Sequence, residues 1–546
     1  MKNKLLQLAL ITFFVYAFFS TVWYQFSGLK LDFFHEAAFP LLYAETNIDT
    51  GTLFSERFSG REISPISWPV VGSILLLLGG KISLSTHSIY SFSFSIFVVV
   101  VGLVFCRTSR FSLFTSVFFL AIIFTSFGPV FSRYQWVDQV WMWPMNSYGV
   151  YDFFSLLCML IYLKAYFEFS TLSEPSKLNK KMPYIWLVSA ALIFFLFSLN
   201  SVRGFLVISG SILVAAAFDM AIKQDPLSKK YIKEWVVILV LSAASLVGLF
   251  LIKYITNGVP QPWQDPHKIA TIGNWVDFRD RLGSFLYTWL TLFNAIPVKG
   301  LSIFSITNLV HISNTFFALL LLILPVLRLK FVSEDFSLAA KLEKLVIYKF
   351  IFLFVLLLIS TVYGTSAMSA RYLLPLAYAS IFVFPFCVES WVKKRRFGIV
   401  AMVLILFLPA YFNSIINFTN YSLNDYKKNK FYDLAVFLEK EGLPYGFAGP
   451  YHTDVLTVNH FSNGKVKLAL IDPENNKLQP HRHADKKSYE SSAYSGITFV
   501  ALPESISMTN RKNLEMRTQA IKTLKHGDWV IDIYPKNVAD QFDNKF

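Results

Sequence analysis

Two acidic residues near the N-terminus have a spacing that suits catalysis or cation binding. Asp32 and Glu36 belong to the segment LDFFHE, which directly follows a long apolar stretch. In a helix, residues four apart lie on one face, so both carboxylates would be held together at the membrane surface. Such a pair could bind a divalent cation such as Mg²⁺ or Mn²⁺, or supply a general base. The alternative is that both are solvated side chains at a helix end.

A second acidic position lies among aromatic residues. Asp138 stands in the segment SRYQWVDQVWMWP, between Trp136 and Trp141. Aromatic faces beside a carboxylate suit a sugar, because the C–H faces of the ring stack on them while the hydroxyls donate to the carboxylate. The alternative is that the tryptophans belong to the aromatic belt at a membrane interface.

Three arginines are candidates for binding a phosphate group. Arg371 lies in the segment SAMSARYLLP beside a late apolar stretch, Arg203 in a tight turn between two apolar stretches, and Arg61 in the first long polar loop. A guanidinium group can form two parallel hydrogen bonds to a phosphate. For Arg371 the alternative is a side chain that anchors a helix end at the lipid headgroups.

Other ionisable residues give weaker signals. Asp152 stands one turn into an apolar segment, where a carboxylate is costly, so we count it with the substrate-binding candidates. His311 reads as a packed core histidine, and His481 with His483 is a weak metal signal without further ligands. The sequence contains no GxSxG motif and no nucleotide-binding glycine loop in a strand–helix context. A reaction on the outer face of a membrane would therefore need a donor that a lipid carries.

The composition excludes an ordinary soluble enzyme. Of 546 residues, 54% are hydrophobic and 16% charged, and the mean hydropathy is +0.48. A soluble domain carries about 25% charged residues. Three cysteines are too few for a disulfide scaffold. The composition indicates a polytopic α-helical membrane protein.

A membrane-spanning helix needs about 20 mostly apolar residues. Eleven stretches meet this requirement approximately, and we predict about 11 transmembrane helices, at 5–27, 87–106, 110–130, 148–167, 183–200, 204–221, 235–255, 307–327, 346–363, 372–390 and 397–416. The stretch 275–298 begins with a charged face, formed by Asp277, Arg279, Asp280 and Arg281, and is predicted to be an amphipathic helix on the outer surface.

The distribution of positive charge predicts the orientation. Lys and Arg exceed Asp and Glu by 15, and with a cytoplasmic N-terminus the basic residues gather in the inner connections, as the positive-inside rule requires. The residues assigned to these connections include Arg107, Lys177, Lys233, Arg328, Lys341, Lys349 and Lys393. This excess of positive charge indicates the orientation of the chain in the membrane and contact with lipid headgroups, and we expect no nucleic-acid partner. An odd number of spans places the C-terminus outside.

The chain divides by composition near residue 416. Residues 1–416 form the predicted transmembrane domain, with long outer segments at 28–86 and 256–306. Residues 417–546 are polar and read as a small α/β domain on the periplasmic side. Its predicted helices are 433–442 and 511–527, and its predicted strands are 445–449, 466–472, 497–502 and 528–534.

This layout resembles the GT-C superfamily of polyprenyl-phosphate-sugar-dependent glycosyltransferases, especially the bacterial protein-mannosyltransferase-like and aminoarabinose-transferase-like members. The resemblance rests on the acidic motif after the first span, the second acid at Asp138, the segment RYLLP that begins at Arg371, and the polar C-terminal domain. It covers the whole chain in layout, and its local motifs are short.

The resemblance implies roles for individual residues. Asp32 takes the place of the first-loop catalytic acid, Glu36 completes a DxxxE variant of the adjacent acidic pair of the family, and Asp138 falls at the second acidic position. The segment GREISPISWP has no Lys where relatives often carry Lys followed by two prolines, so Arg61 or Arg371 would bind the donor phosphate.

The expected function is transfer of a sugar from a polyprenyl-phosphate donor to a cell-envelope glycan, lipid (including lipopolysaccharide) or protein acceptor. The reaction would take place on the outer face of a bacterial inner membrane and would invert the anomeric centre in one displacement. The alternative is a multi-span transporter or flippase for a lipid-linked saccharide, in which buried charges line a path and no bond is made.

Overall fold

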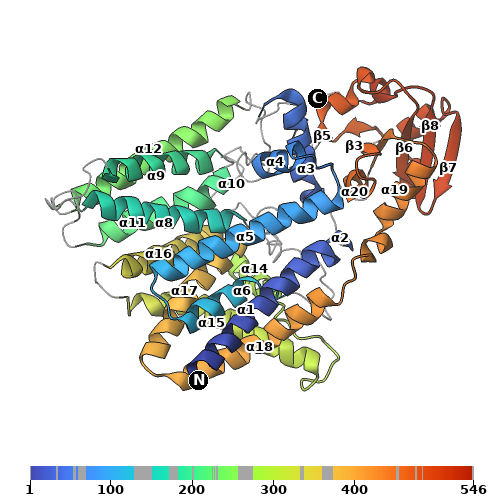
Figure 1. Ribbon diagram of the computed structural model, residues 1–546. Coiled ribbons are helices and arrows are strands. Elements are labelled where there is room, and N and C mark those ends of the chain that lie inside the picture. The colour runs from blue at the N-terminus through green and yellow to red at the C-terminus, as the bar shows by residue number, and fades with distance from the viewer. Residues whose placement is uncertain are drawn as a thin grey trace. The chain divides into compact units, whose positions relative to one another are not determined.

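The computed structural model describes residues 2–31, 35–52, 57–59, 69–127, 150–170, 182–199, 202–223, 226, 228, 231–255, 275–332, 337–359, 373–449, 454–473, 476–481 and 484–543 (Figure 1). The chain forms two compact units. The helical unit comprises Met1–Tyr24, Ser93–Tyr254 and Trp263–Asn420, and the mixed unit comprises Gln25–Phe92, Ile255–Pro262 and Tyr421–Phe546. The predicted boundary near residue 416 lies close to a transition between the units, which follows Asn420, whereas the first long loop, predicted to belong to the transmembrane domain, groups with the C-terminal segment.

Every predicted membrane segment overlaps a helix. These helices, some of which reach into the mixed unit at one end, are α1 (Lys2–Phe26), α5 (Leu84–Thr108), α6 (Leu113–Ile123), α8 (Val150–Ser170), α9 (Met182–Ser198), α10 (Val202–Phe205), α11 (Ser211–Ala221), α12 (Ile232–Ile255), α15 (Ile306–Leu329), α16 (Leu338–Ile359), α17 (Leu374–Lys393) and α18 (Phe397–Thr419). A π-helical turn, Leu206–Gly210, joins α10 to α11.

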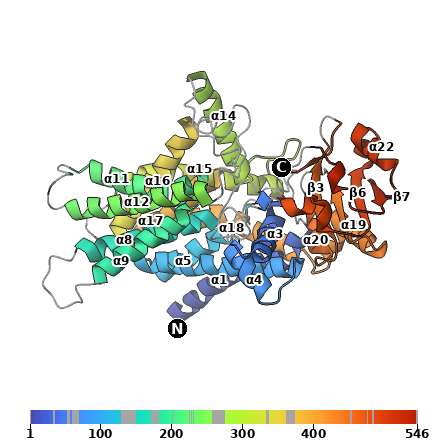
Figure 2. The same cartoon turned by 90° about the horizontal axis from the view of Figure 1, so that it is seen from above.

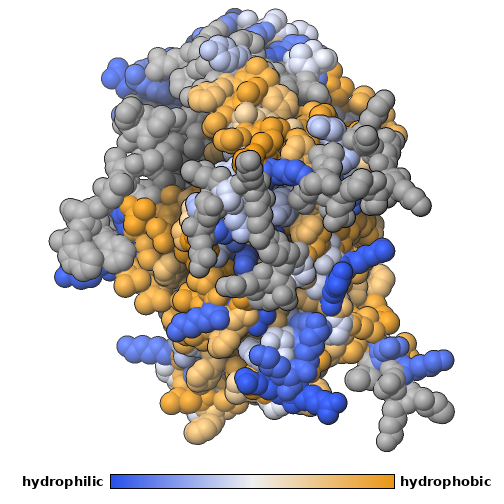
Figure 3. Space-filling view, turned by 90° about the vertical axis from the view of Figure 1, so that its left-hand side faces the viewer, coloured by the Kyte–Doolittle hydropathy of each residue, from blue (hydrophilic) through white to orange (hydrophobic). Residues whose placement is uncertain are grey.

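Six helices in the described part of the chain are long and apolar enough to cross a membrane, and three shorter apolar helices accompany them. The length and composition of the described helices therefore do not confirm the predicted count of about 11 spans. Large apolar side chains such as Leu239, Val247 and Phe250 on α12 are exposed, and apolar surface covers much of the face in Figure 3. Exposure on this scale is typical of a surface that contacts lipid.

Charged residues at one end of the helical unit neutralise one another. The Lys341 ammonium on α16 donates to Asp219 on α11 at 2.7 Å and also to Glu234 on α12, while Lys223 donates to Glu234 at 3.2 Å. Glu234 is 1% exposed, and a buried carboxylate is tolerated because it is paired and hydrogen-bonded. The network ties three helices together at the end that the charge distribution predicts to be cytoplasmic.

The mixed unit contains a six-stranded sheet with the order β4-β3-β2-β6-β8-β7. Its strands are β2 (Tyr445–Ala448), β3 (Lys467–Asp472), β4 (Gln479–Pro480), β6 (Thr498–Pro503), β7 (Lys522–His526) and β8 (Trp529–Tyr534). Strand β2 runs parallel to β3 and β6, and the other pairings are antiparallel. Alternate residues face opposite sides: Phe499 packs with α19 (Lys430–Lys440) and α20 (Thr457–Phe461), whereas Val500 packs with α22 (Arg511–Arg517) on the other side (Figure 2).

The C-terminal elements were largely predicted, with one correction. The helix expected at 511–527 ends at Arg517, and its second half is strand β7. The segment Lys522–His526 pairs with β8, its register running from Lys522 opposite Ile533 to His526 opposite Trp529. Hydrogen bonding to β8 outweighs the helical pattern. Lysines on β7 are typical of an edge strand, where charge prevents pairing with another chain.

The first long loop, residues 28–86, shares a hydrophobic core with the C-terminal segment. It contains α2 (Gly28–Leu31), α3 (His35–Thr50), strand β1 (Phe58–Ser59) and α4 (Pro69–Leu77). Ala38 of α3 and Leu84 at the start of α5 belong to the same buried cluster as Leu434 and Val458. Strand β1 also pairs antiparallel with β5 (Ala484–Asp485). These contacts explain why the first loop folds with the distant terminal sheet.

His460 should make the mixed unit sensitive to acid. Its side chain is fully buried, and burial, helped by the nearby His87, lowers the pKa of the His460 imidazole well below the ordinary 6.5. The unfolded chain therefore binds a proton that the folded chain does not, and stability falls as pH drops below about 6.5, by about 1.4 kcal/mol per pH unit for one such proton. Unfolding of the detergent-solubilised full chain should show this loss between about pH 7.5 and 5.5.

The His460→Asn variant should lose part of this pH dependence. His526→Gln is the matched control, because His526 is partly exposed and contacts the exposed Asp433 at 2.8 Å. An identical pH profile for wild type and His460→Asn would show that His460 is not the group responsible.

Candidate functional site

Most of the residues predicted to carry the reaction lie outside the described residues. Asp32 falls between α2 and α3, and Arg61, Asp138 and Arg371 also lie in undescribed segments, as do Trp136 and Trp141. The backbone is described at Glu36, in the first turn of α3, and at Arg203, in α10, but their side chains are not. Their roles therefore stay predictions from the sequence.

Asp152 is described, and it is buried. It lies in the first turn of α8 and is 1% exposed. Its charge interacts with Lys349 of α16 and with Tyr378 of α17. This predicted substrate-binding residue therefore has charged and polar neighbours on two other helices.

Lys349 corrects an assignment made from the sequence. It was counted with the basic residues of an inner connection, but it lies within α16 and is fully buried. Its ammonium donates to Ser155 Oγ at 2.6 Å, and Ser155 Oγ donates to the carbonyl oxygen of Ile208 at 3.0 Å. The sequence contained a signal for this position, namely a single lysine inside the apolar stretch 346–363. A cation at that depth needs a buried partner.

Replacing Lys349 by Met should destabilise the helical unit. Removing one member of a buried charged group costs about 3–5 kcal/mol, because the partner remains buried. The loss should appear as a lower unfolding temperature in detergent. Lys344→Met, on a half-buried lysine of the same helix, should stay within about 0.5 kcal/mol of wild type. The double variant with Asp152→Asn should lose less than the two single losses combined; strict additivity would mean that the two charges do not interact.

Helix α14 (Trp275–Leu292) contains a residue that the sequence analysis misplaced. The helix is amphipathic as predicted, because Arg279 and Asp280 are exposed whereas Phe285 and Trp289 are buried. It does not simply rest on a surface, since Trp289 Nε1 donates to the carbonyl oxygen of Ala318 on α15 at 3.0 Å. Arg281 was assigned to the charged face but is only 4% exposed.

The guanidinium of Arg281 has no hydrogen-bond partner in the described part of the chain for any of its three nitrogens. A buried and unpaired charge is costly, so an anion is the partner that this position calls for. Phosphate matches the planar array of guanidinium donors. The sequence did carry a signal: Arg281, Phe285 and Trp289 are spaced by four and share one helix face.

The histidines and candidate metal ligands are less informative. His311 is buried as predicted, with Nδ1 2.6 Å from the carbonyl oxygen of Asn294, and it borders an apolar cavity of about 490 Å³. His481 Nε2 lies 3.8 Å from Asp472 Oδ2, and His483 lies outside the described residues. The described residues contain no group of three side chains able to hold a metal ion, so a divalent cation at Asp32 and Glu36 stays a prediction.

The helical unit has membrane-length helices, and the mixed unit combines a first loop with its own helices and a terminal α/β sheet. Comparison with solved structures shows that this chain has the GT-C fold. The crystal structure of ArnT, a GT-C aminoarabinose transferase, from Cupriavidus metallidurans bound to undecaprenyl phosphate is similar over 98% of this chain and 99% of that one, with a TM-score of 0.52 and 12% sequence identity. The apo structure of the same protein has a TM-score of 0.51, with the same identity and coverage. No family model matches the sequence, and no curated protein does.

Proposed function

We propose that this chain is a membrane glycosyltransferase that moves a sugar from a polyprenyl-phosphate donor to a cell-envelope glycan, lipid or protein. The observation that carries the proposal is the similarity, over 98% of the chain, to a transferase structure that holds undecaprenyl phosphate. Helices long enough to cross a membrane and an acidic motif directly after the first of them are consistent with chemistry at a membrane surface.

The residues divide into two roles in this proposal. A sugar on a lipid phosphate already has a good leaving group, so the main electrostatic task is to neutralise the departing phosphate. Arg281 is suited to this task, because it is buried and has no partner in the described chain, with Arg371 or Arg61 or a divalent cation assisting. Asp32 would take the proton of the acceptor hydroxyl, with Glu36 or Asp138 orienting it.

The transporter alternative predicts charged groups that line a path through the helices. The described charges at one end of the helical unit instead form a closed set, with Lys341 bound to Asp219 and Glu234, and Lys349 is bound to Ser155. Side chains held this way suit fixed packing of helices, which favours the enzyme.

The decisive experiment is a transfer assay with the purified full chain in lipid nanodiscs. Undecaprenyl phosphates that carry different sugars would be offered, and release of free undecaprenyl phosphate in the presence of envelope extract would be measured. Release that depends on both the chain and an acceptor supports the proposal. Movement of the intact lipid-linked sugar across the bilayer without release would instead establish the transporter.

A further inference from the structure

The mixed unit contains a polar pocket that the chemistry above does not use. It has a volume of about 200 Å³. The second half of α3 forms one wall, with Glu45, Thr46 and Asp49. The other wall comes from the starts of β2 and β3, with Tyr445 and Lys467, and from the segment after β5. Residues more than 440 positions apart in the chain, such as Glu45 and Lys487, thus line one small space.

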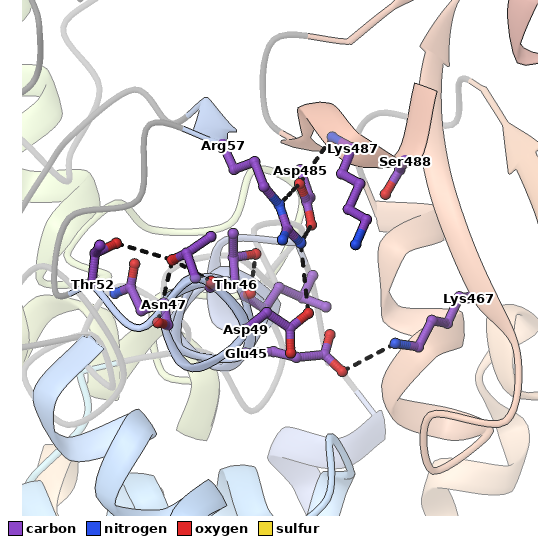
Figure 4. A network of polar contacts seen from close by, with 12 residues as sticks. Glu45, Thr46, Asn47, Asp49, Thr52, Arg57, Lys467, Asp485, Lys487 and Ser488 are labelled. Atoms are coloured by element: carbon purple, nitrogen blue, oxygen red, sulfur yellow. Dashed lines mark hydrogen bonds and ion pairs between the residues drawn. The ribbon is translucent and has the colours of Figure 1, made fainter. Parts of the chain in front are cut away.

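Ion pairs join the two walls of this pocket (Figure 4). Arg57 donates to both carboxylate oxygens of Asp485, with Nε 2.8 Å from Oδ1, and lies 3.5 Å from Asp49. Across the pocket, the Lys467 ammonium is 3.3 Å from Glu45. The backbone is fixed as well, because the amide of Lys486 donates to the carbonyl oxygen of Arg57 at 2.7 Å. The walls are therefore preorganised before any ligand binds.

Lys487 also lines the pocket, but its side chain takes no part in these ion pairs. Its ammonium forms no ion pair or hydrogen bond with the described residues, although its backbone amide donates to Asp485 Oδ1 at 3.0 Å. Figure 4 shows its side chain extended toward the space between Arg57 and Lys467. A ligand with one acidic group could pair with this ammonium without breaking the ion pairs of the walls.

The remaining polar atoms specify a ligand with many hydroxyl groups. The Glu45 and Asp49 side chains are 37% and 52% exposed, so their oxygens still have room to accept hydrogen bonds. Tyr445, which is mostly buried and stacked on Tyr494 with ring centroids 5.0 Å apart, adds an aromatic side chain to the lining of the same pocket. An apolar ligand would leave the Lys487 ammonium unpaired and would remove water from the exposed carboxylate oxygens. A free anion would face two carboxylates to which it can donate no hydrogen bond.

We infer that this pocket binds an acidic sugar residue, one that carries a carboxylate or a phosphate beside its hydroxyls. Helix α3 relates the pocket to the predicted reaction, because Glu36 stands in its first turn and Glu45 nine residues later. At 1.5 Å per residue, the two are about 13 Å apart along the helix axis. An oligosaccharide covers that length, so the bound residue belongs to the acceptor glycan, a statement that rests on the proposed glycosyl transfer.

Binding to the purified full chain tests the pocket without requiring transfer. Three trisaccharides serve as probes, ending in glucuronic acid, in glucose 6-phosphate or in glucose. Affinities would be measured by calorimetry for wild type, Lys487→Gln and Lys487→Glu. Lys465→Gln is the matched control, because Lys465 is an exposed lysine of the same unit that pairs with Glu439, and neither of these two residues lines the pocket.

We expect the acidic probes to bind more tightly than the neutral one. Lys487→Gln should weaken them about tenfold, as for loss of one charge-assisted hydrogen bond, and Lys487→Glu should abolish their advantage. The stronger of the two acidic probes identifies carboxylate or phosphate as the recognised group. Equal affinity of all three probes, no binding, or binding unaffected at Lys487 would each overturn the inference. If acidic probes bind but no sugar is ever transferred, the pocket stands and the proposed function fails.

Discussion

Replacing Arg281 by Met is expected to lower transfer by about a hundredfold to a thousandfold, the usual cost of removing one donor that stabilises developing negative charge. It should also leave the ligand-free protein as stable as wild type or more stable. The two effects have one cause: the guanidinium is 4% exposed and unpaired in the described chain, so it costs stability until an anion arrives.

Unfolding temperature and transfer, measured on the same preparations, separate this role from a structural one. Undecaprenyl phosphate should raise the unfolding temperature of wild type by binding the folded state, and should not do so for Arg281→Met. Arg279→Met is the control, since Arg279 lies two residues away on the same helix, exposed and paired with Asp280 at 3.1 Å. A variant that unfolds early and still responds to the lipid would assign Arg281 to packing.

Replacing Asp32 by Asn should reduce transfer by about a hundredfold to ten-thousandfold, the range that a general base contributes. The amide has nearly the same shape but cannot take up the proton of the acceptor hydroxyl. Expression and unfolding temperature should not change. Rates should be compared with those of Glu504→Gln, which alters an exposed carboxylate in the short helix Glu504–Ser507 after β6 that pairs with Lys525 at 2.7 Å.

Transfer at the wild-type rate by Asp32→Asn would remove this residue from the mechanism and leave Glu36 or Asp138 as the base. A partial loss that recovers at higher pH would indicate that Asp32 assists another base. These outcomes matter because Asp32 is assigned from sequence alone and lies outside the described residues.

The sequence predicts this fold well where the physical signal is local. A stretch of about 20 apolar residues is visible in the chain itself, and for this reason helices such as α5 and α18 lie where they were expected. Strand β7 was missed because Lys522–His526 has no strand pattern of its own and is held by its neighbour β8. Pairing of this kind depends on residues that the segment does not contain.

In the candidate site, too, local features were visible in the sequence and contacts between distant residues were not. Lys349 and Arg281 both carried local signals, one as a lone cation in an apolar stretch and the other as a member of a buried helix face. Lys349 was predicted to lie in a connection and Arg281 on an exposed helix face, because the charge of each side chain was considered before its position in the apolar pattern. The pocket around Lys487 could not be predicted, since Glu45 and Lys467 are 422 residues apart and only the folded chain brings them together.

The pairing of β1 with β5 also has a consequence for biosynthesis. Arg57 and Asp485 are separated by 428 positions, which a ribosome at about 5–20 residues per second covers in roughly 20 to 90 s. Throughout that interval the first loop, which the charge distribution predicts to be exported, has no partner strand and exposes the apolar side of α3. A chain stopped before residue 484 should therefore be a substrate for quality-control proteases, even though most of its membrane helices are complete.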